Sequence, residues 1–185
     1  MNSETKRAIA YLVVIVGMIA LTVPLMRSQS AANEQAERFQ RSFNLSSGGT
    51  LDVDNYKGTI HVTGSDTNQV TVDVTKRFDG SESTRKWWLE NLQINFHNYG
   101  NHVSVEVKYP DCTFCWQGLN YEAAVELEIH VPRQTNVKLE SYKPDIKVAA
   151  IQGDIRVKSY KSPIEIDSTT GSIRIDTYKD NIKLR

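Results

Sequence analysis

A nine-residue repeat of apolar pairs in the last quarter of the chain restricts its fold more than any other feature. One residue separates the two members of each pair, and six repeats follow one another without a slip. Period-two alternation is typical of a strand with one buried face, and its return at a fixed spacing predicts stacked strands. The first members are Val137, Ile146, Ile155, Ile164, Ile173 and Ile182, and the second members are Leu139, Val148, Val157, Ile166, Ile175 and Leu184.

A second period, of 18 residues, overlies the first. Tyr-Lys pairs begin at residues 142, 160 and 178, and glycines lie at 153 and 171. Two strands per structural unit follow from this spacing. We therefore predict an all-β fold, a β-solenoid similar to a single-stranded β-helix, with about nine residues per strand and 18 per coil. An antiparallel meander also returns to the same end after every second strand, so the periodicity leaves that alternative open.

The N-terminal part of the chain carries a membrane signal. Residues 8–26 form an uncharged apolar run, long enough to cross a bilayer as one transmembrane helix. Two basic residues precede the run and one follows it, so residues 1–7 are expected to be a cytoplasmic tail. The remaining chain is then extracytoplasmic, periplasmic or on the cell surface. The run is either a membrane anchor or a signal peptide cleaved before Asn33, and both interpretations export the same domain.

The chain beyond the apolar run divides into a stalk and one domain. Residues 27–44 are polar and predicted to be a helical or extended stalk, and patterning typical of a globular domain covers residues 45–185. Residues 63–136 interrupt the repeats and are predicted to be an insert that caps the regular array of residues 137–185.

Two local signals lie within the insert. Residues 82–92 are predicted to form the one helix of the domain, with Ser81 or Ser83 as N-cap and Trp88 and Leu92 on one face. Residues 98–101, Asn-Tyr-Gly-Asn, are expected to form a hairpin turn between two strands.

The two cysteines, Cys112 and Cys115, are also in the insert. In an exported chain they are predicted to form a local disulfide, which closes only a short loop. A metal site would need two further ligands, and none of the four histidines has a spacing that suggests one. A redox role would need the first cysteine at a helix N-terminus, whereas Pro110 precedes it here.

The composition and motifs of the chain argue against nucleic-acid binding and catalysis. Twenty-two basic and 22 acidic side chains give no net charge, so the usual electrostatic signature of a nucleic-acid partner is absent. No sequence motif for a cofactor or a catalytic nucleophile is present. The acidic pairs Asp52/Asp54 and Glu126/Glu128 resemble glycosidase carboxylates, but the outer face of any strand requires polar residues at such positions. We therefore predict a protein that is not an enzyme and has no cofactor.

Three sequence features together resemble the bacterial putative-adhesin family of β-strand repeats. They are the phrase SGGTLDVDNYKGTIHVTG at residues 47–64, the strand VELEIHVP at residues 125–132, and the Gly-x-Ile-x-Val repeats. The resemblance covers residues 45–185 and implies a β-solenoid-like fold on the cell envelope, with adhesion or envelope sensing as its role. The family is a domain of unknown function with no accepted catalytic residues. The cysteine pair and the Trp-Trp helix depart from its pattern.

Outward side chains of an 18-residue coil should stack in charge columns. Two columns alternate in sign, Glu140/Lys158/Asp176 and Lys147/Glu165/Lys183, whereas Lys138, Arg156 and Arg174 form a wholly basic row. We predict that this basic row meets an acidic ligand such as an envelope polymer. The expected partner of the module as a whole is an envelope protein or a glycan. The predicted function is thus a non-enzymatic adhesin or interaction module; an envelope-sensing ectodomain and a β-helix carbohydrate-active enzyme are the alternatives.

The tyrosines at 142, 160 and 178 are interpreted as corner stacking in preference to a sugar-binding ladder.

Overall fold

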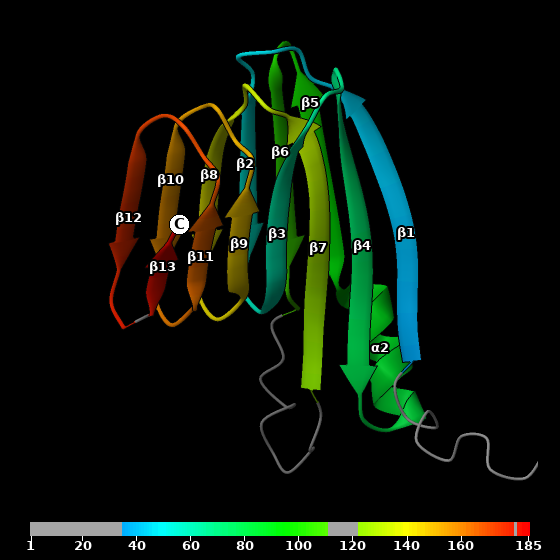
Figure 1. The fold of residues 1–185 in the computed structure, drawn as a ribbon. Helices are drawn as coiled ribbons and strands as arrows, with labels where there is room; N and C mark the ends of the chain where they lie inside the picture. The colour runs from blue at the N-terminus through cyan, green and yellow to red at the C-terminus, as the bar shows by residue number, and fades with distance from the viewer. Residues whose placement is uncertain (1–34, 111–121, 180) are drawn as a thin grey trace, which may run out of the picture. The chain divides into compact units, whose positions relative to one another are not determined.

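The computed structural model describes residues 35–110, 122–179 and 181–185, which form thirteen strands and one helix (Figure 1). Alternation of buried residues with more exposed ones marks most of the strands, as the sequence predicts. The elements are β1 (Gln35–Asn44), β2 (Thr50–Asn55), β3 (Gly58–Ser65), β4 (Gln69–Asp79), α2 (Glu82–Asn91), β5 (Gln93–Tyr99), β6 (His102–Lys108), β7 (Glu122–Pro132), β8 (Asn136–Ser141), β9 (Asp145–Ala149), β10 (Ile155–Ser159), β11 (Ile164–Asp167), β12 (Ile173–Thr177) and β13 (Ile182–Leu184).

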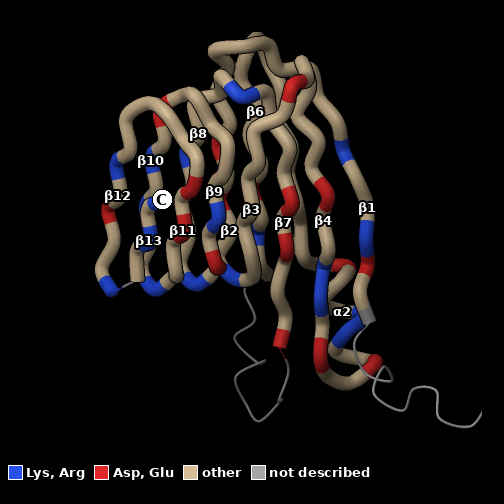
Figure 2. Tube along the Cα trace, in the orientation of Figure 1, with Lys and Arg blue, Asp and Glu red and all other residues tan. Residues whose placement is uncertain are grey.

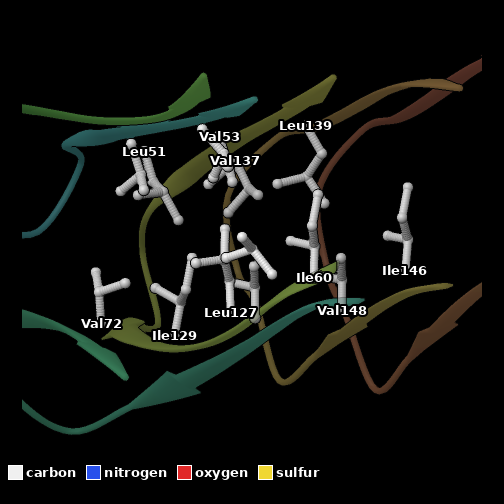
Figure 3. Close-up of a cluster of buried hydrophobic side chains, with 14 of the residues drawn as sticks. Leu51, Val53, Ile60, Val72, Leu127, Ile129, Val137, Leu139, Ile146 and Val148 are labelled. Atoms are coloured by element: carbon white, nitrogen blue, oxygen red, sulfur yellow. The ribbon is translucent and has the colours of Figure 1, made fainter. Parts of the chain in front are cut away.

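The strands form two sheets that face one another. The seven-strand sheet has the order β1-β4-β7-β3-β9-β11-β13, and the six-strand sheet has the order β12-β10-β8-β2-β6-β5. Figure 3 shows the core between them, where Leu51, Val53 and Leu139 of the six-strand sheet point toward Ile60 and Leu127 of the other. Each of these side chains is buried, and such burial contributes roughly 2 kcal/mol per residue.

The last six strands pair in parallel with a step of 18 residues. Val137 of β8 lies opposite Ile155 of β10, which lies opposite Ile173 of β12. In the other sheet Ile146, Ile164 and Ile182 are aligned in the same way on β9, β11 and β13. Successive nine-residue segments therefore alternate between the sheets, and two of them make one 18-residue unit.

The prediction of a β-solenoid is wrong for the molecule as a whole. Its strands form two mixed sheets in which β1–β4, β4–β7 and β5–β6 pair antiparallel. The order β4-β7-β3 also places strands side by side that are far apart in the sequence. The alternation of apolar residues identifies a strand and its buried face, but it does not specify the direction or identity of the neighbouring strand. For that reason the sequence repeat predicts the pairing of only some of the strands in the two sheets.

The insert, residues 63–136, does not sit on the repeats as a separate cap but extends both sheets. It supplies β4 and β7 to the seven-strand sheet and β5 and β6 to the six-strand sheet. Its two local predictions are confirmed. Helix α2 begins after the N-cap Ser81 and buries Trp88, and β5 and β6 form a hairpin across Gly100, which has a φ of 60°.

The stalk prediction is wrong over residues 35–44, which form the edge strand β1. This strand pairs with β4 along its whole length, from Gln35 opposite Phe78 to Asn44 opposite Gln69. Most residues of β1 are polar, but Phe39 and Phe43 point inward. Both contact Phe96 of β5, with ring centroids 6.4 and 5.6 Å apart, so three aromatic rings close this end of the sandwich.

The described residues include no helix that is both long and apolar enough to span a bilayer. The predicted tail (residues 1–7), the predicted membrane segment (residues 8–26) and the Cys112/Cys115 pair all lie outside the described residues.

Candidate functional site

The strongest candidate for a ligand site is a row of three cations on the outer face of the six-strand sheet, Lys138, Arg156 and Arg174. They lie on β8, β10 and β12 and are directly opposite one another in the parallel register. All three are exposed. Figure 2 marks the basic and acidic positions along the strands of the two sheets. They line a shallow hollow of about 290 Å³. We call these three residues the cation row.

A ladder of side-chain hydrogen bonds fixes the strands beside the cation row. Asn136 Oδ1 accepts from the backbone N–H of Asp154 at 3.0 Å. One unit further on, Asp154 Oδ1 accepts from Ser172 Oγ at 2.8 Å and from its backbone N–H at 3.1 Å. These bonds from Ser172 hold the pKa of the Asp154 carboxyl below its usual value. Because the ladder joins three neighbouring strands, the cations project from a fixed surface.

The three cations differ in their counter-charges. Lys138 Nζ lies 3.5 Å from Asp52 Oδ1, and Arg174 Nε lies 3.8 Å from Asp176 Oδ2. Within the described ranges, no carboxylate forms an ion pair with Arg156. The guanidinium at the centre of the row therefore has no ion-paired carboxylate in the part of the chain that the structure describes.

An acidic group borders the cation row toward β2 and β6. Glu106, Asp54 and Glu140 lie opposite one another on β6, β2 and β8. Burial, and then the charges of Glu140 and Glu106, raise the pKa of the Asp54 carboxyl. These carboxylates line a second hollow of about 390 Å³ that also contains Lys138 and Arg156. Across residues 35–110, 122–179 and 181–185, no three His, Cys, Asp or Glu side chains are grouped to hold a metal ion.

Three of the four carboxylates in the acidic pairs of the sequence have basic partners that local sequence does not reveal. Asp52 lies 2.9 Å from His102 Nε2, and Glu128 lies 3.1 Å from His61 Nδ1. Glu126 lies 2.7 Å from Arg77 Nε. These partners come from neighbouring strands, so only the strand order could have identified them. The two pairs also belong to different sheets, and they do not form one pair of carboxylates facing a common substrate.

The tyrosines predicted to stack at one corner do so, and the stack includes Tyr56 as a fourth ring. The centroids of Tyr56, Tyr142, Tyr160 and Tyr178 are 4.8, 4.8 and 5.0 Å apart, with interplanar angles of 3 to 5°. Neighbouring rings cover one another's faces, so the inner rings have no free face on which a sugar could stack. The corner-stacking interpretation is the one that the geometry favours.

Both predicted columns of alternating charge occur in the register of the strands. Lys158 Nζ lies 3.8 Å from Glu140 Oε2 on the six-strand sheet. On the other sheet, Lys183 Nζ lies 3.4 Å from Glu165 Oε1. Lys147, in the same column, is exposed and forms no ion pair with another described residue.

Comparison with solved structures finds distant likenesses. A "putative cell adhesion protein" from Clostridium sporogenes is 10% identical, with a TM-score of 0.43, over 80% of this chain and 99% of that one. A "putative adhesin" from Parabacteroides distasonis is 13% identical, with a TM-score of 0.30, over 79% of this chain and 67% of that one. A "putative lipid binding protein" from the same organism is 13% identical, with a TM-score of 0.28, over 83% and 63% of the two chains.

No protein-family model matches the chain, and no curated protein sequence matches it. Several similar structures carry the adhesin description that the resemblance in the sequence also implies. Because identities and TM-scores are low, we infer neither fold nor function from these likenesses.

Proposed function

We propose that the chain is an extracytoplasmic, adhesin-like interaction module that binds an acidic envelope glycan along the cation row. The observation that carries this proposal is Arg156, an exposed guanidinium without a carboxylate partner in the described chain, placed between two further cations. A guanidinium binds carboxylate oxygens through paired hydrogen bonds, which suits the acidic groups of a uronic acid polymer.

The spacing of the cation row favours a linear ligand. Neighbouring strands of a sheet are about 4.8 Å apart, so the outer two cations are separated by roughly 10 Å at their backbones. A polymer that lies across the strands could present an acidic group to each cation in turn. Lys138 and Arg174 already have carboxylates near them, so each contributes less than Arg156 to the attraction.

The proposed location rests on the sequence. The uncharged run at residues 8–26 is a signal for export, and the basic residues before it favour an extracytoplasmic domain. No feature of the described residues favours the alternatives of an envelope-sensing ectodomain or a carbohydrate-active enzyme.

The test of the proposal compares two charge reversals in the intact chain. Arg156→Glu should weaken binding to a polyuronate of defined length by about 5- to 30-fold, because a reversed charge at the centre of the row is worth about 1–2 kcal/mol. Lys147→Glu is the matched control, since Lys147 is an exposed, unpaired cation on the other sheet. Binding would be measured by titration calorimetry at several salt concentrations. An equal loss of affinity in both variants would show that net charge, not the cation row, determines binding.

A further inference from the structure

The last 18-residue unit exposes side chains that the preceding units bury. Ile173 is 40% exposed, whereas Ile155, at the same position one unit earlier, is 2% exposed. Leu184 is 57% exposed, and its equivalent Ile166 is 1% exposed. Ile182 shows the same contrast with Ile164. The preceding units show what covers such positions, namely another strand on each sheet that carries apolar side chains inward.

The backbone at this edge is also unpaired in the described structure. Strand β12 pairs only with β10, and β13 pairs only with β11. Both sheets therefore end on strands that pair with no further described strand on one side. An exposed edge next to apolar side chains is a template for adding a further strand.

The opposite edge of the sandwich is closed. There Phe39 and Phe43 of β1 meet Phe96 of β5 across the space between the sheets, as described above. Among the described residues, the β12/β13 edge is thus the one edge of the sandwich whose apolar side chains between the two edge strands are exposed. A contact that buries this edge in two copies must then join like edge to like edge, which is the arrangement of a closed two-fold dimer.

We propose that the β12/β13 edge binds the same edge of a second copy of this chain. In the inferred dimer, β12 pairs antiparallel with its counterpart about a two-fold axis at Ile175. Arg174 of each copy then lies directly opposite Asp176 of the other, so the strand is complementary in charge to itself. Opposite charges on directly facing residues stabilise an antiparallel pair, and like charges destabilise it. This inference does not depend on the proposed glycan ligand.

The charges at β13, the other strand of this edge, oppose the contact only weakly. Lys183 Nζ and Arg185 Nη1 both lie 3.4 Å from Glu165 Oε1, so their positive charge is partly met within the chain. Because the two-fold axis is normal to the sheets, both copies present their six-strand sheets on the same side. The two cation rows of the dimer would face one surface together.

A pair of charge variants tests the register. Arg174→Asp leaves acidic residues at both 174 and 176, and Asp176→Arg leaves basic residues at both. Each variant alone should dimerise at least about tenfold more weakly than the wild type, because like charges face one another across the axis. An equimolar mixture of the two should recover the wild-type affinity, since every facing pair is then opposite in charge. Association would be measured with the intact chain in nonionic detergent, by sedimentation velocity and by energy transfer between differently labelled variants.

A second experiment tests the apolar part of the contact. Ile182→Thr with Leu184→Thr retains residues that favour a strand but removes exposed apolar surface, and should also weaken dimerisation at least about tenfold. Tyr99→Thr is the control, because Tyr99 is 71% exposed at the β5–β6 turn, away from this edge. Circular dichroism would verify that each variant is folded. A wild type that stays monomeric at high concentration, a dimer unaffected by the double substitution, or a mixture that associates no better than its components would each overturn the inference.

Discussion

Single residues on the outer face of the six-strand sheet are placed by neighbours from distant parts of the chain. Asp54 is the clearest case, because Glu106 and Glu140 lie beside it on the two adjacent strands. Partial burial, and then the negative charges of these two residues, disfavour the ionised form of Asp54 and raise its pKa. The fold thus retains a charge that costs stability at neutral pH.

Asp54→Asn should therefore stabilise the protein at pH 7. A carboxyl whose pKa is raised in the folded state opposes folding when ionised, and this cost appears as pH rises from about 3.8 through the folded-state pKa. We expect the free energy of unfolding to increase by less than about 1 kcal/mol, since the side chain remains exposed and is screened by solvent. Urea denaturation at pH 7 and at pH 3.5 would measure the difference between wild type and variant, which should be much smaller at the lower pH. Asp145→Asn, an exposed change on the other sheet, should show no comparable gain; a gain of the same size there would contradict the explanation.

The sequence could not supply this detail of the site. It predicted that Lys138, Arg156 and Arg174 share a row, because a fixed repeat spacing is enough to align residues of successive units. It did not reveal that His102 contacts Asp52, or that Asp54 lies between two acids, because those contacts depend on which strands are neighbours. Interactions within the repeat were predictable, and interactions between the repeat and the insert were not.

At the scale of elements, the inward and outward faces of each repeat strand followed from the sequence. Ile155 of β10 is buried between Val137 and Ile173, and Arg156, the next residue, is exposed. The sequence analysis did not predict the edge strand β1, because most of its residues are polar and only two phenylalanines indicate a buried face. Strand propensity is weak information where pairing with a long partner such as β4 determines the structure.

Ile155→Asp tests this assignment of faces. The substitution places a carboxylate in the apolar core without a partner, so it should cost about 4 kcal/mol or more, or abolish cooperative folding. Arg156→Glu changes the adjacent outward residue and should alter the free energy of unfolding by less than about 1 kcal/mol. Urea denaturation followed by tryptophan fluorescence would compare the two variants. Similar losses in both would mean that the faces of β10 are assigned incorrectly.

At the scale of the whole molecule, the domain formed by the described residues has two ends that differ in construction. One end is closed by aromatic rings and longer antiparallel strands, and the other consists of 18-residue units in parallel register. The turns of these units also stack in columns. A Cβ on Gly153 would lie 2.3 Å from the carbonyl oxygen of Thr135, and one on Gly171 would lie 2.5 Å from that of Gly153. The turns that precede β10 and β12 therefore each require glycine at this position.

Deletion of residues 155–172 should be tolerated. It removes one 18-residue unit and joins Asp154 to Ile173, so that β12 and β13 take the places of β10 and β11. We expect cooperative unfolding with a lower midpoint, because one layer of core is lost. Deletion of residues 155–163 preserves the apolar alternation but moves each later turn to the opposite end of its sheet, away from its column. Thermal unfolding followed by circular dichroism should show a much larger loss for the shorter deletion, and equal losses would contradict a requirement for whole units.

The parallel register also has a consequence for how such a protein can evolve. Duplication of one unit within the gene would lengthen both sheets together, and the closed end would need no compensating change. Each added unit would bring its own outward residue to the cation row and its own tyrosine to the corner stack. The reach of the binding surface could therefore change between descendants in discrete steps, while the edge available to a second copy is passed on to whichever unit comes last.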